Sequence, residues 1–135
     1  MSKASSVRIK PVEIQLGGEK YLLKYDFNAL IELEEIYGSI EDAMETMSGK
    51  KVFDEQGKPV MDKTETGEEV QKRKFTIKPI RDFLWAGLLA YKKQITKEEV
   101  ASLLNFVDFS RIVEKLTEAL NAAMPVVKAE DEVKN

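Results

Sequence analysis

The spacing of apolar residues changes once along this chain of 135 residues, from a period of two to helical spacing. Alternation of apolar and polar residues begins at Val12, Ile14 and Leu16, and it resumes in the segment 21–25 after a glycine pair at 17–18. Such alternation around a Gly-Gly turn is typical of a β-hairpin. Because a two-stranded hairpin is marginally stable by itself, we expect it to lie on helices or to pair with another chain.

From Phe27 onward the apolar residues recur every three or four positions, which predicts helices. Capping residues and terminating glycine or proline residues place these helices at about 26–37, 39–47, 79–93, 96–104 and 108–124. The segment 79–93 is apolar around more than half of its circumference, so we expect it to be the central buried helix. The sequence therefore predicts an α+β fold, mostly α, in which an N-terminal β-hairpin is followed by about five helices.

The segment 48–74 lacks regular spacing and contains three glycines, one proline and a dense mixture of charges. We expect a long mobile loop here that orders on partner binding, with a small exposed hairpin between residues 52 and 61. The length of the chain fits one domain. We therefore expect a single domain over 1–125, followed by a disordered polar tail at 126–135.

The chain contains no cysteine and no histidine, which removes disulfides, Cys/His zinc sites, thiol nucleophiles and Ser-His-Asp triads. Two carboxylate pairs share helix faces, Glu32 with Glu35 and Glu41 with Glu45, but their spacing is not specific for a metal. We expect no enzyme activity, no metal and no cofactor. No apolar run approaches the roughly 20 residues that span a bilayer, and the N-terminus lacks the apolar centre of a signal peptide. We therefore expect a soluble intracellular protein without a membrane partner.

Charge is distributed unevenly, with −7 over residues 26–48 and +6 over residues 72–93, against −3 for the whole chain. The two segments could attract each other within the fold, which is the simpler interpretation. They could also present opposite poles to partners or to other copies of the chain, which leaves self-association open. The basic cluster at 71–74 follows six acidic residues, so we do not expect it to bind nucleic acid.

Glu34 falls within the apolar arc of the first predicted helix. An unpaired carboxylate there would cost several kcal/mol on burial. We therefore expect a structural ion pair between Glu34 and Arg81, with Lys78 as the other candidate partner.

Trp85 lies outside the main apolar arc of the predicted helix 79–93, on a side flanked by cations. Aromatic and arginine residues dominate protein-binding hot spots, and methionines adapt to varied partners. The candidate partner-binding residues are therefore Trp85, Arg81, Leu88, Lys92, Met44 and Met47. The alternative, which we favour for Trp85, is that its ring covers the rim of the core under the stems of neighbouring cations.

The segment Lys24–Gly38 reads KYDFNALIELEEIYG. It resembles a stretch near the start of tailed-phage tail assembly chaperones, where a hairpin leads into a helix of the form Phe/Tyr-x-Phe-x-Ala-Leu-x-x-Leu-Glu-Glu-x-x-Gly. This resemblance covers the hairpin and the first helix. It implies a non-enzymatic protein in the cytoplasm of the bacterial host that binds the tape measure protein and recruits tail tube subunits.

Two other functions remain open at this point. The chain could be a structural tail or head-completion subunit that stays in the particle. It could also be a small prophage regulatory module that binds nucleic acid through residues 72–81. Presence in purified particles and a steep dependence of binding on salt would respectively indicate these two alternatives.

Overall fold

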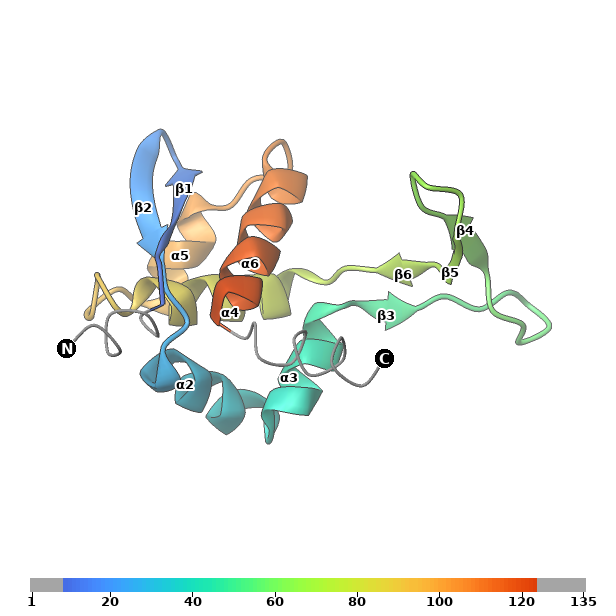
Figure 1. Cartoon of the computed structure of the whole chain (residues 1–135), viewed down its shortest axis with the longest axis horizontal. Coiled ribbons are helices and arrows are strands. Elements are labelled where there is room, and N and C mark those ends of the chain that lie inside the picture. Colours follow the sequence, from blue (N-terminus) through green and yellow to red (C-terminus); the bar gives the residue numbers. More distant parts are fainter. Residues whose placement is uncertain (1–8, 124–135) are drawn as a thin grey trace.

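Helix α4 (Ile77–Leu88) runs through the middle of the structure, and the other elements of the core pack around it (Figure 1). The computed structural model describes residues 9–123. In the view of Figure 1 the N-terminal hairpin, α5 and α6 lie on one side of α4, and α2 and α3 lie on the other. The described residues form an N-terminal hairpin and five helices, which confirms the predicted α+β, mostly helical fold. The predicted tail at 126–135 lies outside the described residues.

The hairpin consists of β1 (Val12–Leu16) and β2 (Glu19–Leu23), paired antiparallel so that Leu16 faces Glu19. The connecting turn is therefore the glycine pair 17–18, with φ angles of 59° and 85°. Residues other than glycine rarely adopt positive φ angles at two successive positions, which is why the turn needs glycine at both. The alternating residues of β1 are buried, as predicted, and this strand packs against α6.

The remaining helices are α2 (Phe27–Tyr37), α3 (Ile40–Met47), α5 (Lys97–Leu103) and α6 (Phe109–Ala123). Several begin at the capping residues that the sequence indicated. The Asp26 side chain accepts a hydrogen bond from the backbone N–H of Ala29 at 3.0 Å. Thr96 and Glu99 form a complete capping box at the start of α5. These local contacts explain why the starts of α2 and α5 were predicted well.

Helix α4 was predicted over 79–93, and both bounds were wrong. The helix begins at Ile77, because Pro79 lies in the first turn, where backbone N–H groups have no intrahelical partner to lose. It ends at Leu88, where the carbonyl of Gly87 accepts a hydrogen bond of 2.9 Å from the backbone N–H of Lys24. A tertiary contact with the end of the hairpin thus replaces the next helical bond, and helical spacing alone could not reveal it.

Residues 50–74 form an arm that extends away from the helices (Figure 1). Its stem pairs β3 (Lys50–Lys51) with β6 (Arg73–Lys74), and its longer hairpin pairs β4 (Met61–Lys63) with β5 (Glu69–Gln71). The long loop expected at 48–74 thus contains two strand pairs that the sequence did not indicate. Most side chains of the arm are exposed, so no alternation of apolar residues marks its strands. The small hairpin between residues 52 and 61 is confirmed by an antiparallel bridge between Phe53 and Pro59. Mobility of the segment stays a prediction.

A ring of three backbone hydrogen bonds joins the stem to both hairpins of the arm. Val52 donates to the carbonyl of Lys72 at 3.0 Å, Lys72 donates to Val60 at 2.7 Å, and Val60 donates to Val52 at 3.0 Å. Each of the three residues thus donates once and accepts once. The ring fixes the point at which two hairpins branch from one stem.

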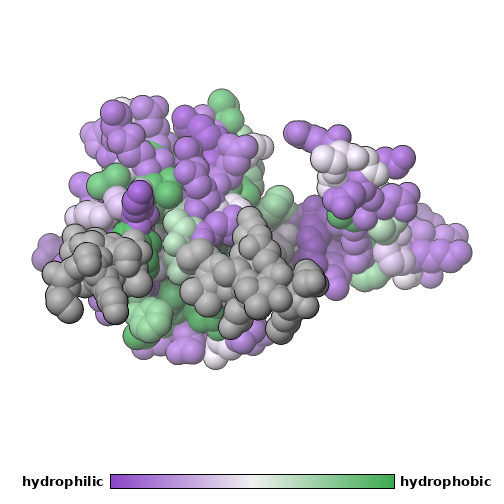
Figure 2. Space-filling view, viewed as in Figure 1, coloured by the Kyte–Doolittle hydropathy of each residue, from purple (hydrophilic) through white to green (hydrophobic). Residues whose placement is uncertain are grey.

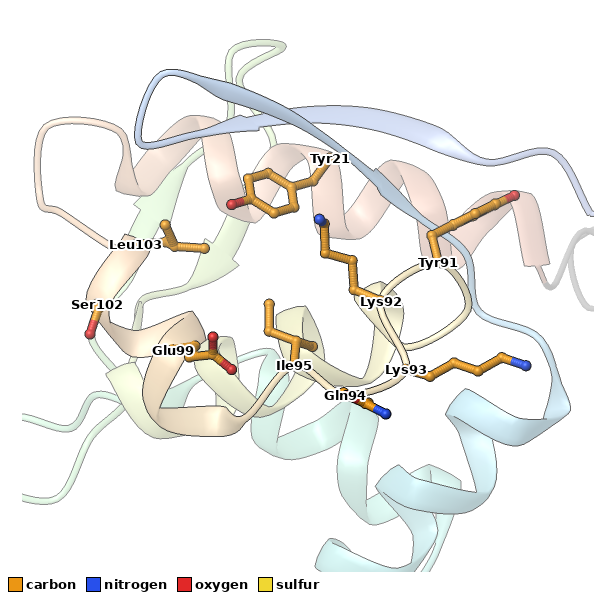
Figure 3. Close-up of a pocket in the computed structure, with 9 residues that line it drawn as sticks. All are labelled: Tyr21, Tyr91, Lys92, Lys93, Gln94, Ile95, Glu99, Ser102 and Leu103. Carbon is orange, nitrogen blue, oxygen red and sulfur yellow. The ribbon is translucent and has the colours of Figure 1, made fainter.

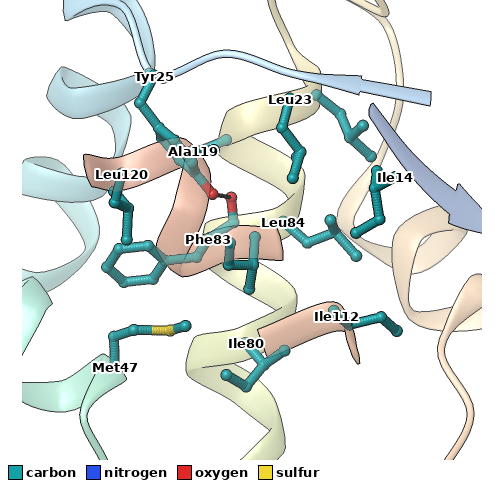
Figure 4. Packing of buried hydrophobic residues seen from close by; sticks show 14 of the residues in the cluster. Ile14, Leu23, Tyr25, Met47, Ile80, Phe83, Leu84, Ile112, Ala119 and Leu120 are labelled. Atoms are coloured by element: carbon teal, nitrogen blue, oxygen red, sulfur yellow. Dashed lines mark hydrogen bonds between the residues drawn. The ribbon is translucent and has the colours of Figure 1, made fainter. Parts of the chain in front are cut away.

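The core combines buried side chains from the hairpin, α4 and α6 (Figure 4). Tyr25, which follows β2, is fully buried, and its hydroxyl donates a hydrogen bond of 2.6 Å to the carbonyl of Phe83 (dashed in Figure 4). Burial raises the pKa of the Tyr25 hydroxyl, so it stays protonated and remains a donor. This bond and the contact of Lys24 with Gly87 attach the end of the hairpin to α4.

Candidate functional site

The six predicted partner-binding residues do not form one surface. Leu88 is fully buried in the core, which excludes it from direct contact with a partner on the folded domain. Met47 also belongs to the core and is 6% exposed, at the base of the groove that contains Met44. The set on α4 was derived from a helix that continued to residue 93. Because the helix ends at Leu88, Lys92 lies beyond it and no longer projects from the same face as Arg81 and Trp85.

The predicted ion pair between Glu34 and Arg81 was wrong. Glu34 is exposed on α2, and Arg81 instead binds Asp82, with its Nη2 2.7 Å from Oδ1 and its Nε 3.1 Å from the same oxygen. Helix α2 buries the side that carries Ala29 and Leu33 and turns Glu34 outward. The apolar arc of this helix was broader than the face it buries.

The buried carboxylate of the described chain is that of Asp82, whose exposed fraction is zero. Its Oδ2 accepts hydrogen bonds from the Tyr37 hydroxyl at 2.8 Å and from Lys78 Nζ at 3.0 Å, while Arg81 occupies Oδ1. Burial by itself would raise the pKa of Asp82, but the hydrogen bonds from Arg81, Lys78 and Tyr37 outweigh it and hold the pKa below its usual value. Since every oxygen is bonded within the fold, the cluster is a structural network joining α2 to α4.

Trp85 is half-buried and packs against the core, in agreement with the core-rim interpretation. Its indole N–H donates to the carbonyl of Ile95 at 3.0 Å, and Lys97 Nζ lies 4.8 Å from the ring centroid. The cation over the ring is therefore Lys97, and not Arg81 or Lys92. A hollow of about 550 Å³ between α2 and the end of α4 includes Trp85 together with Glu32 and Lys93.

Lys92 lines a second and broader hollow of about 730 Å³, between β2, α5 and the turn that follows α4 (Figure 3). Its ammonium group points toward Tyr21, with Nζ 5.4 Å from the ring centroid (Figure 3). The carboxylate of Glu99 in the same hollow accepts the backbone N–H of Thr96. Both charged groups are thus engaged within the fold.

Met44 is half-buried and lies in a groove of about 390 Å³ between α3, α6 and the residues that follow the arm. Phe75 and Val113 share this groove with Met44. Of the predicted partner-binding residues, Met44 and Trp85 are the apolar ones that are half-buried, and they lie in different hollows.

A further apolar groove lies beside exposed large side chains and was not foreseen from the sequence. We call it the Phe106 groove, and it has a volume of about 230 Å³ and is lined by Ile77, Ala101, Leu104, Asn105, Phe106 and Phe109. Phe106 is 81% exposed, Val107 93% and Ile77 52%. Contiguous exposed apolar patches often mark sites of protein–protein contact.

Hydrogen bonds hold the loop that presents Phe106 and Val107. The Asn105 side chain accepts the backbone N–H of Asp108 at 2.9 Å and donates to the Asp108 carboxylate at 3.2 Å. The ring centroids of Phe106 and Phe109 lie 6.4 Å apart. The sequence signal was two adjacent apolar residues between Asn105 and Asp108, outside the apolar stripe of either flanking helix.

Within residues 9–123 no three acidic side chains are close enough together to hold a metal ion. Over the same residues, no helix combines the length and the apolar character needed to cross a bilayer. No protein-family model, no curated protein and no solved structure matches this chain.

Proposed function

We propose that this chain is a non-enzymatic protein-binding module, and in particular a phage tail assembly chaperone. In this role it binds the tape measure protein in the cytoplasm of the bacterial host and recruits tail tube subunits to it. The observation that carries the proposal is the Phe106 groove, an apolar surface beside two strongly exposed side chains. The resemblance of Lys24–Gly38 to tail assembly chaperones supplies the class of partner.

The positions of the residues in that motif support a binding role for part of it. Tyr25, Ala29 and Leu33 are buried and are accounted for by the core. Phe27 is 80% exposed and Ile31 is half-exposed one turn later, so the packing of residues 9–123 leaves both side chains accessible. An apolar pair at spacing i, i+4 on the outside of a helix suits contact with another helix.

Apolar contact is the physical basis of the proposed activity. Burying a side chain such as Phe106 in a partner contributes roughly 1.5–3 kcal/mol. Contacts of this kind tolerate varied sequences, because they depend on buried area more than on direction. A groove and a few exposed side chains therefore suit reversible binding along a long helical protein.

The test is co-expression with the tape measure protein encoded alongside, followed by affinity capture at about 150 and about 500 mM salt. We expect capture at both salt concentrations and improved solubility of the tape measure protein. The double variant Phe106→Ser with Val107→Ser should abolish capture. The control is Phe53→Ser on the arm, which changes a phenylalanine that is 54% exposed and lies outside the Phe106 groove, and it should capture normally.

Three outcomes would argue against the proposal. If the tape measure protein stays insoluble and is not captured, the chaperone role is wrong. Detection of the chain in purified particles would favour a retained structural subunit. Binding of nucleic acid that weakens steeply between about 50 and 200 mM salt would favour the regulatory alternative.

A further inference from the structure

The stem of the arm concentrates positive charge in an unusual arrangement. Its two registered pairs are Lys50 opposite Lys74 and Lys51 opposite Arg73, so every residue in both pairs is basic. Like charges directly opposite each other destabilise strand pairing. The backbone of Val52 bonds to Lys72, which adds a further cation at the end of the stem.

The fold neutralises little of this charge. Arg73 lies 3.3 Å from the carboxylate of Glu45 on α3, and it also donates to the carbonyl of Gly49 at 3.0 Å. Among the described residues, the three stem lysines and the neighbouring Lys72 have no carboxylate within 4.0 Å, and all four are exposed. Within residues 9–123, Arg73–Glu45 is also the one ion pair that joins the acidic segment 26–48 to the basic segment 72–93. The simpler expectation, that these segments neutralise each other within the fold, is thus met at a single pair.

Side chains directly opposite each other in a sheet project from the same face, which groups Lys50 with Lys74. Lys72 lies one residue before β6, and its carbonyl continues the stem by accepting the backbone N–H of Val52. These three residues form what we call the stem lysine face. Lys51 and Arg73 project from the other face, toward which Glu45 reaches.

Acidic regions bound the stem on both sides. The two hairpins beyond it, residues 53–71, carry six acidic and two basic side chains, net −4. On the other side, α3 exposes Glu41, Asp42 and Glu45. The hydropathy view shows how hydrophilic the arm is, at the right of Figure 2. A long polyanion such as nucleic acid would have to cross one of these acidic regions, whereas a short acidic segment would not.

We propose that the stem lysine face is a docking site for a short acidic segment of a partner protein. Carboxylates placed between Lys50, Lys72 and Lys74 would relieve the repulsion across the stem and form charge-assisted hydrogen bonds. This surface is separate from the Phe106 groove, and the proposal does not depend on the tail assembly role. The arm extends it away from the helices, so a partner can reach it without displacing any element of the core.

The probe is a fluorescein-labelled peptide of about six residues in which Asp alternates with Ser, because alternation places the carboxylates on one side of an extended chain. We expect a rise in fluorescence anisotropy with added protein at about 50 mM salt, and weaker binding at higher salt. Amide signals of the stem in an NMR titration should shift on binding. A peptide with Asn in place of Asp should neither bind nor cause these shifts.

Matched variants separate the stem from general charge. Lys50→Gln with Lys74→Gln should weaken binding of the acidic peptide roughly five- to tenfold. Lys58→Gln with Lys63→Gln removes the same charge from the hairpins of the same arm and should leave binding within twofold. The stem variant should keep its pairing, because it removes a repulsion, and the amide signals of Val60 and Lys72 report this directly.

The proposal is overturned by any of four results. These are equal losses in the two double variants, equal binding of the neutral peptide, shifts confined to residues outside the stem, and no binding of the acidic peptide. Tighter binding of a single-stranded oligonucleotide of equal charge at the same salt would assign the surface to nucleic acid and would also overturn it.

Discussion

The hydroxyl of Tyr37 donates a hydrogen bond of 2.8 Å to the buried carboxylate of Asp82, and this bond joins the end of α2 to the middle of α4. The other bonds to Asp82 come from Lys78 and Arg81, within its own helix. Tyr37 is thus the residue through which this network links two helices. Its ring also packs against Phe83, with centroids 6.3 Å apart.

Removal of the Tyr37 hydroxyl should measure the strength of this link. Tyr37→Phe keeps the ring packed on Phe83 and should lower the free energy of unfolding by about 1.5–3 kcal/mol, since the lost bond is to a charged group. Asp82→Asn should cost at least as much, because it removes the charge that both cations face. Lys78→Gln should cost less than about 1 kcal/mol, since the Lys78 side chain is 66% exposed. Denaturant titration gives all three values, and an equal loss in all three would contradict this order.

Acid should weaken the same network. The folded state holds the pKa of Asp82 below its usual value, so the unfolded chain binds a proton on this carboxyl more readily than the folded protein does. The stabilisation is fully present above the ordinary carboxyl pKa of about 3.9, and it is lost as pH falls through the lower folded value. Stability measured from pH 6 downward should therefore fall less steeply in Asp82→Asn than in the unaltered protein. Identical slopes would show that Asp82 does not contribute to acid sensitivity.

Glu34→Gln should leave stability almost unchanged. The sequence suggested a buried ion pair, for which this substitution would cost about 1–3 kcal/mol. In the structure Glu34 is exposed, so the change in the free energy of unfolding should stay within about 0.5 kcal/mol. A larger loss in the denaturation midpoint would mean that Glu34 has a partner after all.

The error over Glu34 shows what helical spacing can and cannot predict. The rule that a carboxylate among apolar residues must be paired was sound, and it applies to Asp82. Spacing along α2 gives an apolar arc, but which side of that arc is buried depends on the neighbouring helices. Phe27 and Ile31 are apolar and exposed, while Tyr37 is turned toward α4.

Local signals predicted the parts of the fold that local interactions determine. The Gly-Gly turn, the Asp26 cap and the Thr96–Glu99 capping box each depend on residues within a few positions of one another. The strands of the arm pair residues such as Lys50 and Lys74, which are far apart in sequence and exposed on both faces. No apolar pattern in the sequence marks such pairing. The Phe106 groove was missed for a similar reason, because Ile77 is distant in sequence from the other residues that line it.

Trp85→Ala should reduce stability more than partner capture. Removing a large, partly buried aromatic ring from the rim of the core costs about 3 kcal/mol, and the bond from the indole to Ile95 is lost with it. Trp85→Phe keeps most of the packing and should cost less. Capture of the tape measure protein by Trp85→Phe should match that of the unaltered chain. Loss of capture with unchanged stability would instead make Trp85 a binding residue.

Gly87→Ala should destabilise the protein, although alanine is the better helix former. By propensity alone the change within α4 would add about 1 kcal/mol of stability. A Cβ atom at Gly87, however, would lie 2.9 Å from the Leu23 side chain and 2.9 Å from the Tyr25 ring, and both side chains are fully buried. Overpacking of this kind costs about 1–3 kcal/mol, so the measured change should be a net loss.

The variant Leu23→Ala with Gly87→Ala provides the matched test, because it removes one of the two obstacles. If the close approach is the cause, the two substitutions together should cost less than the sum of their separate effects in denaturant titrations. A gain in stability from Gly87→Ala alone would mean that the hairpin does not pack this closely on α4.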